Sequence, residues 1–150
     1  LDKGKQELPI TDKRMTRFLI TLEESVDLID WSFNHPDSHG NIIVPRLESM
    51  KMTDLAKELG EANGVNNIKL NYVGIRPGEK IHEEMISEEE WLRTEDGGEN
   101  YLINQDNENF LPGQPLKRER DTRELKSYNS KDSLMGREEA FRFLEETGVI

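Results

Sequence analysis

The sequence contains no cysteine among its 150 residues, and only 7% of the residues are aromatic. Without cysteine the chain has no disulfide framework, no thiol nucleophile and no thiolate metal site, which fits a reducing compartment. No apolar run approaches the length of a membrane-spanning helix, and residues 1–7 have no signal-peptide pattern. We therefore expect a cytoplasmic protein without a membrane partner. Because the sequence does not begin with methionine, we also expect it to be a piece of a longer protein.

Positive charge is also scarce, because the sequence has 20 Lys and Arg residues but 31 Asp and Glu residues, which gives a net charge of −11. Nucleic acids and anionic membranes are bound by basic surfaces, so the balance argues against both as partners. The composition, 33% hydrophobic and 34% charged, predicts a modest core. Any phosphate site must then be local and formed by a few arginines.

Three catalytic or cofactor patterns are missing. The glycines do not form the glycine-rich turn of a dinucleotide-binding unit. None of the three tyrosines has a lysine four residues later, as the catalytic pair of a short-chain dehydrogenase requires. His82-Glu83 lacks the second histidine of a zinc-protease helix, because Ile86 stands at that position. We expect no catalytic residue, no metal site and no cofactor site in this chain.

Hydrophobic spacing predicts strands that alternate with helices. The expected elements are an extended segment at 8–11, strands at 18–20, 41–45 and 69–75, and helices at 22–34, 52–59 and 81–86. Thr21 with Glu24, and Ser87 with Glu90, have the spacing of capping boxes, and the second of these opens a short acidic helix. Gly60 is expected to stop the helix at 52–59. This alternation is typical of α/β proteins with mainly parallel pairing.

We expect residues 1–94 to form an α/β region and residues 95–150 an extended tail packed on the same domain. Glycines and prolines between polar runs predict a long surface excursion over 95–123, with one short strand at Tyr101–Ile103. Near the end, Ala140, Phe141 and Leu144 form an apolar stripe on a predicted helix that Gly148 terminates.

The stretch Arg76-Pro77-Gly78-Glu79-Lys80 joins the strand at 69–75 to the helix predicted at 81–86. Pro77 keeps Arg76 extended and suits a first helical turn, so the guanidinium would lie beside free backbone N–H groups. A helix N-terminus and an arginine fork both bind phosphate. Glu79 could accept hydrogen bonds from hydroxyls attached to that phosphate, as in a nucleotide sugar. From spacing alone, the alternative is a loop arginine paired with a nearby acid.

Three ordered blocks of sequence carry a resemblance. The blocks are Pro9–Asp12 with Arg14–Phe18 and Ile20–Leu22; Val44-Pro45 with Met50–Ala56; and Val73–Lys80 with His82-Glu83. They resemble the C-terminal half of the inverting UDP-N-acetylglucosamine 4,6-dehydratases, which are extended short-chain dehydrogenases of bacterial capsule, O-antigen and flagellin-sugar pathways. The resemblance covers roughly residues 7 to 90. Tyr128-Asn129-Ser130 before a terminal helix is similar to the ends of some capsule-pathway members.

The resemblance implies an α/β substrate-binding region of an extended short-chain dehydrogenase, without its Rossmann cofactor half. By the matching positions, Arg76 would hold the pyrophosphate, Glu79 the ribose hydroxyls, and Thr11 would line the uridine side. Met15 and Arg17 lie beside Thr11 in the matching block and are further candidates. We interpret Arg14 as a surface cation.

The parent enzyme would be a lyase that uses NADP to oxidise C4 of the sugar, eliminates water across C5 and C6, and returns hydride with inversion at C5. Those steps belong to the absent half, so this chain would bind substrate and be inactive in isolation. Its partners would be a UDP-sugar and either the missing Rossmann half or a second copy, because strands such as 41–45 would present open edges. Two alternatives stay open: another nucleotide-sugar epimerase or reductase, and a non-enzymatic acidic module that binds a basic partner.

Overall fold

The computed structural model describes residues 7–105 and 124–150, and the described chain is a mixed α/β protein with small sheets. In chain order the elements are β1 (Glu7–Ile10), β2 (Thr16–Phe18), α1 (Leu22–Asn34), the 3-10 turn η1 (Pro36–Ser38), β3 (Asn41–Pro45), β4 (Ser49–Lys51), α2 (Met52–Ala62), β5 (Lys69–Tyr72), β6 (Glu84–Ile86), α3 (Glu88–Trp91), β7 (Thr94–Asp96), β8 (Asn100–Asn104), β9 (Tyr128–Asn129) and α4 (Arg137–Glu146).

The chain divides into two compact units that interleave along the sequence. Unit 1 takes in the residues up to Thr21, then Leu47–Glu83 and Asn129–Ile150, and unit 2 takes in Leu22–Arg46 and Glu84–Tyr128. Each unit draws on both regions expected from the sequence, 1–94 and 95–150. The boundary at 94/95 therefore does not coincide with the division into units.

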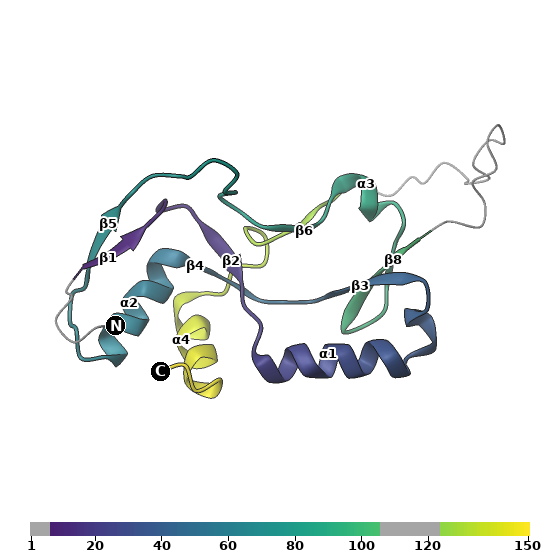
Figure 1. Ribbon diagram of the computed structural model, residues 1–150, viewed down its shortest axis with the longest axis horizontal. Helices are drawn as coiled ribbons and strands as arrows, with labels where there is room; N and C mark the ends of the chain where they lie inside the picture. The colour runs from purple at the N-terminus through teal and green to yellow at the C-terminus, as the bar shows by residue number, and fades with distance from the viewer. Residues whose placement is uncertain (1–6, 106–123) are drawn as a thin grey trace. The chain divides into compact units, whose positions relative to one another are not determined.

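In unit 1, β1 and β5 lie side by side and run parallel, with Glu7 opposite Lys69 and Ile10 opposite Tyr72 (Figure 1). β2 pairs with β4 in antiparallel fashion, and β4 leads directly into α2. Met50, Ala140 and Leu144 form a buried apolar cluster in this unit, with partly buried apolar side chains around it. The terminal helix that the stripe at 140–144 predicts is confirmed as α4.

In unit 2, β3, β8 and β7 form a three-stranded antiparallel sheet. Val44, Ile86 and Ile103 form its core. Arg46 fastens the sheet, because its guanidinium lies 4.0 Å above the Tyr101 ring and 2.6 Å from the Asp96 carboxylate. None of the described helices combines the length and apolarity needed to span a bilayer.

Several predicted elements are confirmed and others are wrong. The helix at 22–34, the strand at 41–45 and the short strand at 101–103 appear as α1, β3 and part of β8. The strand expected at 18–20 lies earlier, as β2. The excursion expected over 95–123 begins instead with the β7–β8 hairpin, and its residues 106–123 lie outside the described chain. The capping box of Ser87 and Glu90 is confirmed.

Pairing is antiparallel for β2 with β4, β3 with β8 and β7 with β8, contrary to the expectation, whereas β1 and β5 run parallel. One reason is visible at β7 and β8, which a short turn containing Gly97-Gly98 connects as a hairpin. A parallel pair needs a crossover of a dozen or more residues, whereas an antiparallel pair needs only such a turn.

The helix expected at 81–86 does not form, and residues 84–86 are the strand β6. The carbonyl oxygens that such a helix would use are bound elsewhere: Thr16 N–H donates to Ile81 O at 3.0 Å, and Ser130 N–H donates to Glu83 O at 2.8 Å. Long-range pairing therefore overrides the local helical pattern.

Gly60 does not stop α2, which continues to Ala62. A Cβ at this position would lie 3.0 Å from the Ile68 side chain, so the glycine allows close packing inside the helix. Gly64, with a φ of 75°, follows the helix end instead, and its N–H donates to Glu61 O at 2.9 Å.

Candidate functional site

The candidate site lies where the carboxyl ends of the parallel strands β1 and β5 meet. The pairing of these strands continues beyond them, since Val73 N–H donates to Ile10 O at 2.9 Å and Gly74 N–H donates to Thr11 O at 3.1 Å. The loop after β1 and the loop that holds Arg76 therefore start side by side. In α/β sheets the carboxyl ends of parallel strands are the usual place for ligands.

Residues Arg76–Glu79 form a tight turn and not the start of a helix. Glu79 N–H donates to Arg76 O at 3.1 Å, and Gly78 has a φ of 87°. Proline at the second position and a positive-φ glycine at the third are the residue pattern of a type II turn. Arg76 N–H donates to a Glu79 carboxylate oxygen at 3.0 Å and closes the turn a second time. The expected helix N-terminus is thus wrong, although the turn itself is well defined.

The Arg76 side chain is exposed, and its guanidinium has no ion pair with a carboxylate of the described residues. Glu79 is half-buried, and one oxygen of its carboxylate is used by the turn. The loop arginine tied to a nearby acid, which spacing alone left open, is not what the described chain shows. An exposed guanidinium on a rigid turn is suited to bind an anion with two parallel hydrogen bonds.

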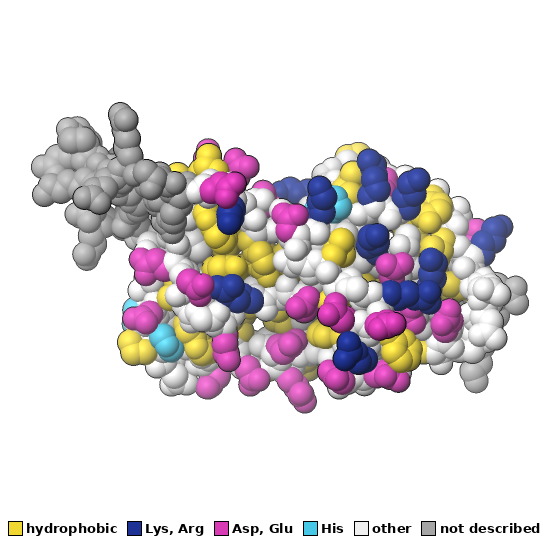
Figure 2. Space-filling model, turned by 180° about the vertical axis from the view of Figure 1, so that it is seen from behind, with side chains coloured by type: hydrophobic (Ala, Val, Ile, Leu, Met, Phe, Trp, Pro, Cys, Tyr) yellow, Lys and Arg dark blue, Asp and Glu magenta, His cyan; other side chains and the backbone are white. Residues whose placement is uncertain are grey.

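Cations gather at this end of an otherwise acidic protein. On the face of unit 1 seen in Figure 2, Lys and Arg side chains cluster toward the end that carries β1 and β5. The two loops supply four exposed cations, which are Lys13, Arg14, Arg76 and Lys80. A local positive field of this kind raises the concentration of an anionic ligand even when the net charge is negative.

Arg14 forms a two-bond pair with Asp12. Its Nε and Nη2 donate to the two carboxylate oxygens at 2.9 Å each, and its backbone N–H donates to the same group at 2.8 Å. These hydrogen bonds lower the pKa of Asp12 from 3.8 to about 2. The side chain of Arg14 is 60% exposed, in agreement with its interpretation as a surface cation.

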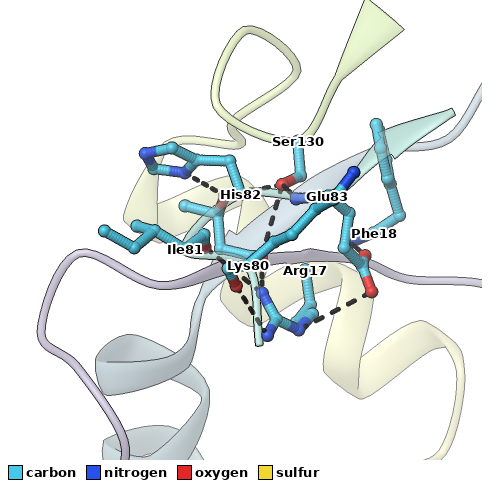
Figure 3. A network of polar contacts seen from close by, with 8 residues as sticks. Arg17, Phe18, Lys80, Ile81, His82, Glu83 and Ser130 are labelled. Carbon is cyan, nitrogen blue, oxygen red and sulfur yellow. Dashed lines mark hydrogen bonds and ion pairs between the residues drawn. The ribbon is translucent and has the colours of Figure 1, made fainter. Parts of the chain in front are cut away.

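Arg17 lies among backbone carbonyls of its own chain (Figure 3). Its Nη1 donates to Thr16 O at 2.7 Å and Ile81 O at 3.2 Å, and its Nη2 donates to Lys80 O at 3.1 Å. Glu83 lies 3.6 Å from its Nε. The guanidinium therefore holds the segment that leaves the Arg76 turn.

The remaining predicted residues differ in exposure. Thr11 is half-buried at the start of the loop, where its carbonyl accepts from Gly74. Met15 is only 5% exposed, and its carbonyl accepts from Met52 N–H at 3.0 Å. The structure thus places Thr11 and Arg76 on adjoining loops and gives Met15 a packing role. A ligand contact from any of the five predicted residues stays a prediction.

Sequence reasoning did not single out Thr16 as a member of this region, and it quoted Ser130 only within a resemblance. Both are buried, at 1% and 0% exposure, and their hydroxyl oxygens lie 2.6 Å apart. A threonine in a strand and a serine 114 residues later give no local signal of a contact.

The described residues do not suit a dinucleotide cofactor or a metal. No strand-to-helix connection in the described chain carries more than one glycine, whereas a dinucleotide pyrophosphate needs a glycine-rich turn there. Over the described ranges, no group of three or more potential ligand side chains could hold a metal ion. What the arrangement can do is bind and orient an anionic ligand.

Together the fold and the turn define a mixed α/β protein with an exposed arginine at the carboxyl ends of paired strands. The model of the family described as "polysaccharide biosynthesis protein" matches residues 1–105, and the chain belongs to this family.

Two relatives show what the chain is similar to. It is 44% identical over 90 residues to a UDP-N-acetylglucosamine 4,6-dehydratase (inverting) of Campylobacter jejuni, an alignment that covers 60% of this chain and 25% of the relative. It is 38% identical over 104 residues to a UDP-glucose 4-epimerase of Rickettsia canadensis, covering 69% and 30%. The chain thus spans between a quarter and a third of the length of these curated relatives.

The fold also has a counterpart of known structure. The X-ray structure of Pen from Bacillus thuringiensis matches 99% of this chain and 44% of its own, with a TM-score of 0.74 and 22% sequence identity. At that identity the match supports the fold alone. The chain thus belongs to the polysaccharide biosynthesis family, and the two curated relatives that it resembles are named as a nucleotide-sugar dehydratase and a nucleotide-sugar epimerase.

Proposed function

We propose that the chain is the UDP-sugar-binding portion of a nucleotide-sugar dehydratase in bacterial polysaccharide biosynthesis. The observation that carries this proposal is the Arg76–Glu79 turn, which presents an exposed guanidinium at the carboxyl ends of β1 and β5. Two curated relatives named for UDP-sugar chemistry support it.

In the proposed complex, the Arg76 guanidinium binds the diphosphate, and the Glu79 carboxylate accepts hydrogen bonds from the ribose hydroxyls. Thr11 lies on the adjoining loop, on the uridine side. Glu79 can do this while its other oxygen holds Arg76 N–H, because an ionised carboxylate offers about four acceptor positions. Met15 and Arg17 stay predicted members of the site, and their described contacts support the loops.

The proposed contribution of this chain to catalysis is binding and orientation. Holding the diphosphate fixes the sugar relative to catalytic groups supplied from outside the chain, and orientation alone can contribute much of a rate enhancement. In the parent enzyme NADP would supply the hydride chemistry, and the described residues do not fit that cofactor. We therefore propose that the chain by itself is inactive.

A second proposal concerns partners. α1 has no buried residue, and four of its apolar side chains are exposed, namely Leu22 at 82%, Phe33 at 79%, and Val26 and Ile29 at 56% each. Exposed apolar faces of this kind favour association. We propose that the chain self-associates or is completed by a Rossmann half. Light scattering at increasing concentration should show particles larger than a monomer, and a strict monomer at high concentration would contradict self-association.

Calorimetry with UDP and with UDP-N-acetylglucosamine tests the sugar-nucleotide site. We expect binding in the micromolar range for the 150-residue chain and a loss of roughly 10-fold to 100-fold in affinity for Arg76→Ala, because a charge-assisted two-bond contact is removed. Arg142→Ala is the matched control, since Arg142 is an exposed arginine on α4. Equal heats for Arg76→Ala and the unaltered chain would refute the assignment, and no heat in either would favour the acidic interaction module.

An epimerase is the second candidate, because the relatives of 38–39% identity from several Rickettsia species are UDP-glucose 4-epimerases. The arginine turn would serve UDP recognition in either enzyme. Product analysis by NMR, with the full-length parent and each UDP-sugar, separates the two. A 4-keto-6-deoxy product supports the dehydratase, and a C4 epimer supports the second candidate.

A further inference from the structure

We propose that Ser130 and Thr16 are positioning residues, which hold the Arg76–Glu79 turn in its binding geometry through the segment that follows it. Neither side chain is expected to touch the ligand. The affinity readout of this proposal rests on the proposed function, whereas its structural readout does not.

Ser130 joins the C-terminal part of unit 1 to the segment after the turn (Figure 3). Its hydroxyl accepts a hydrogen bond from Glu83 N–H at 2.8 Å, and its own N–H donates to Glu83 O, also at 2.8 Å. Its carbonyl accepts from the Ser49 hydroxyl at 2.5 Å. Because Ser130 and Ser49 are both 0% exposed, water cannot replace these bonds when one partner is lost.

Thr16 extends the same network. Its hydroxyl lies 2.6 Å from the Ser130 hydroxyl and 2.8 Å from Nδ1 of His82. In one order that satisfies every group, Glu83 N–H donates to Ser130, Ser130 donates to Thr16, and Thr16 donates to His82 Nδ1; the Ser130 hydroxyl also lies 3.3 Å from Thr16 O, a second acceptor. Each hydroxyl then donates once and accepts once, so the chain of hydrogen bonds fixes residues 82 and 83 as a unit.

These anchors act on the turn because few residues separate them from it. Between Glu79 and Glu83, the carbonyl of Ile81 accepts from Thr16 N–H at 3.0 Å, and the carbonyl of Lys80 accepts from Arg17 at 3.1 Å. On the other flank, Gly74 N–H holds the chain to Thr11 O at 3.1 Å. The turn is thus fixed at both ends, and loss of the Ser130 hydroxyl weakens one end, because it removes one of the anchors of the segment at 80–83.

Ser130→Ala removes the hydroxyl and leaves Glu83 N–H and the Thr16 hydroxyl each short of a partner. Thr16→Val removes the second hydroxyl while keeping the branched shape, and Thr16→Ser keeps the hydroxyl and should rescue the network. Ser38→Ala is the matched control, because Ser38 is also buried, at 8% exposure, and its hydroxyl binds two carbonyls at 2.6 Å in unit 2.

The first readout is NMR of the ligand-free 150-residue chain. In Ser130→Ala and Thr16→Val we expect shifted amide signals for Gly78 and Glu79, and amide hydrogen exchange at Glu79 faster by roughly fivefold or more. Thr16→Ser and Ser38→Ala should leave both unchanged. Unchanged Gly78 and Glu79 signals in both Ser130→Ala and Thr16→Val would overturn the proposal, whatever UDP does.

The second readout is UDP affinity, for which we expect a loss of roughly fivefold to tenfold in the two disruptive variants and wild-type values in Thr16→Ser. Lower thermal stability with unaltered turn signals and affinity would mean that Ser130 is merely structural, and would also overturn the proposal. If the unaltered chain shows no UDP heat while the turn signals shift as expected, the positioning role is supported and the proposed function fails. Should Ser130→Ala not fold, Thr16→Val against Thr16→Ser decides.

Discussion

Replacement of Arg17 by alanine separates the two roles that this residue could have. The resemblance to dehydratases places Arg17 beside the ligand, whereas the structure shows its guanidinium bound to backbone carbonyls. In the first role the variant loses UDP affinity and keeps its stability. In the second role it loses stability, and its affinity falls because the segment after the Arg76 turn is released.

The expected loss of stability follows from the contacts. The guanidinium makes three hydrogen bonds to carbonyls, at 2.7, 3.1 and 3.2 Å, and its side chain is 25% exposed. Such bonds contribute roughly 0.5–1.5 kcal/mol each. Arg17→Ala removes all three bonds at once, so we expect it to lower the free energy of unfolding by about 2–3 kcal/mol. The ion pair with Glu83 at 3.6 Å adds little, since that carboxylate is 43% exposed.

Urea unfolding followed by circular dichroism measures this loss, and calorimetry with UDP measures affinity in the same preparations. Arg17→Lys should retain part of the stability, because an ammonium group reaches one or two of the three carbonyls but lacks the planar fork. Arg14→Ala is the matched control: Arg14 lies in the same stretch, its side chain is 60% exposed, and its hydrogen bonds go to Asp12 alone. We expect it to change the free energy of unfolding far less than Arg17→Ala does, because solvent screens the exposed pair with Asp12.

One result would refute this reasoning. If Arg17→Ala unfolds at the same urea concentration as the unaltered chain and loses UDP binding, the carbonyl contacts are not important for stability. Arg17 would then be a ligand residue, as the resemblance implies.

Three other perturbations test features of the fold. Hydrogen bonds from Arg14 lower the pKa of Asp12 from 3.8 to about 2. The stabilisation from this pair is therefore fully present above the unfolded-state pKa and is lost as pH falls through about 2. A carboxylate NMR titration measures this pKa, and Arg14→Ala should return it toward 3.8. Gly60→Ala should lower the free energy of unfolding by about 1 kcal/mol, because overpacking outweighs the gain in helix propensity. The added Cβ would lie 3.0 Å from the buried Ile68 side chain. A higher urea midpoint for the variant would contradict this prediction. Ser87→Ala removes the N-cap of α3 and should cost about 1 kcal/mol, which thermal unfolding measures, while an unchanged midpoint would show that the cap is dispensable.

The elements that sequence reasoning found are those specified by nearby residues. α1 begins at Leu22, directly after Thr21, and its end before Pro36 follows from the restriction that a proline places on the residue before it. β3 has a run of β-branched residues, and Gly148, with a φ of 68°, ends the last helix as expected. In each case the signal lies within a few positions of the boundary that it sets.

The errors share a different cause. The pattern at 81–86 reads as a helix, but Thr16 and Ser130 take up the carbonyls of that segment. Likewise Gly60 reads as a helix stop, whereas Ile68 packs against it from outside the helix. In both places a residue outside the local segment decides the conformation, and no local sequence pattern identifies that residue.

The candidate site divides in the same way. The sequence by itself determined the turn, because proline followed by glycine restricts the backbone at Arg76–Glu79 wherever the segment lies. Only the tertiary structure decided that Arg17 binds carbonyls, that Met15 is buried and that Ser130 holds the segment after the turn. Backbone dihedral preferences act over a few neighbouring residues, whereas the partner of a side chain depends on which distant segments the fold brings within hydrogen-bonding distance.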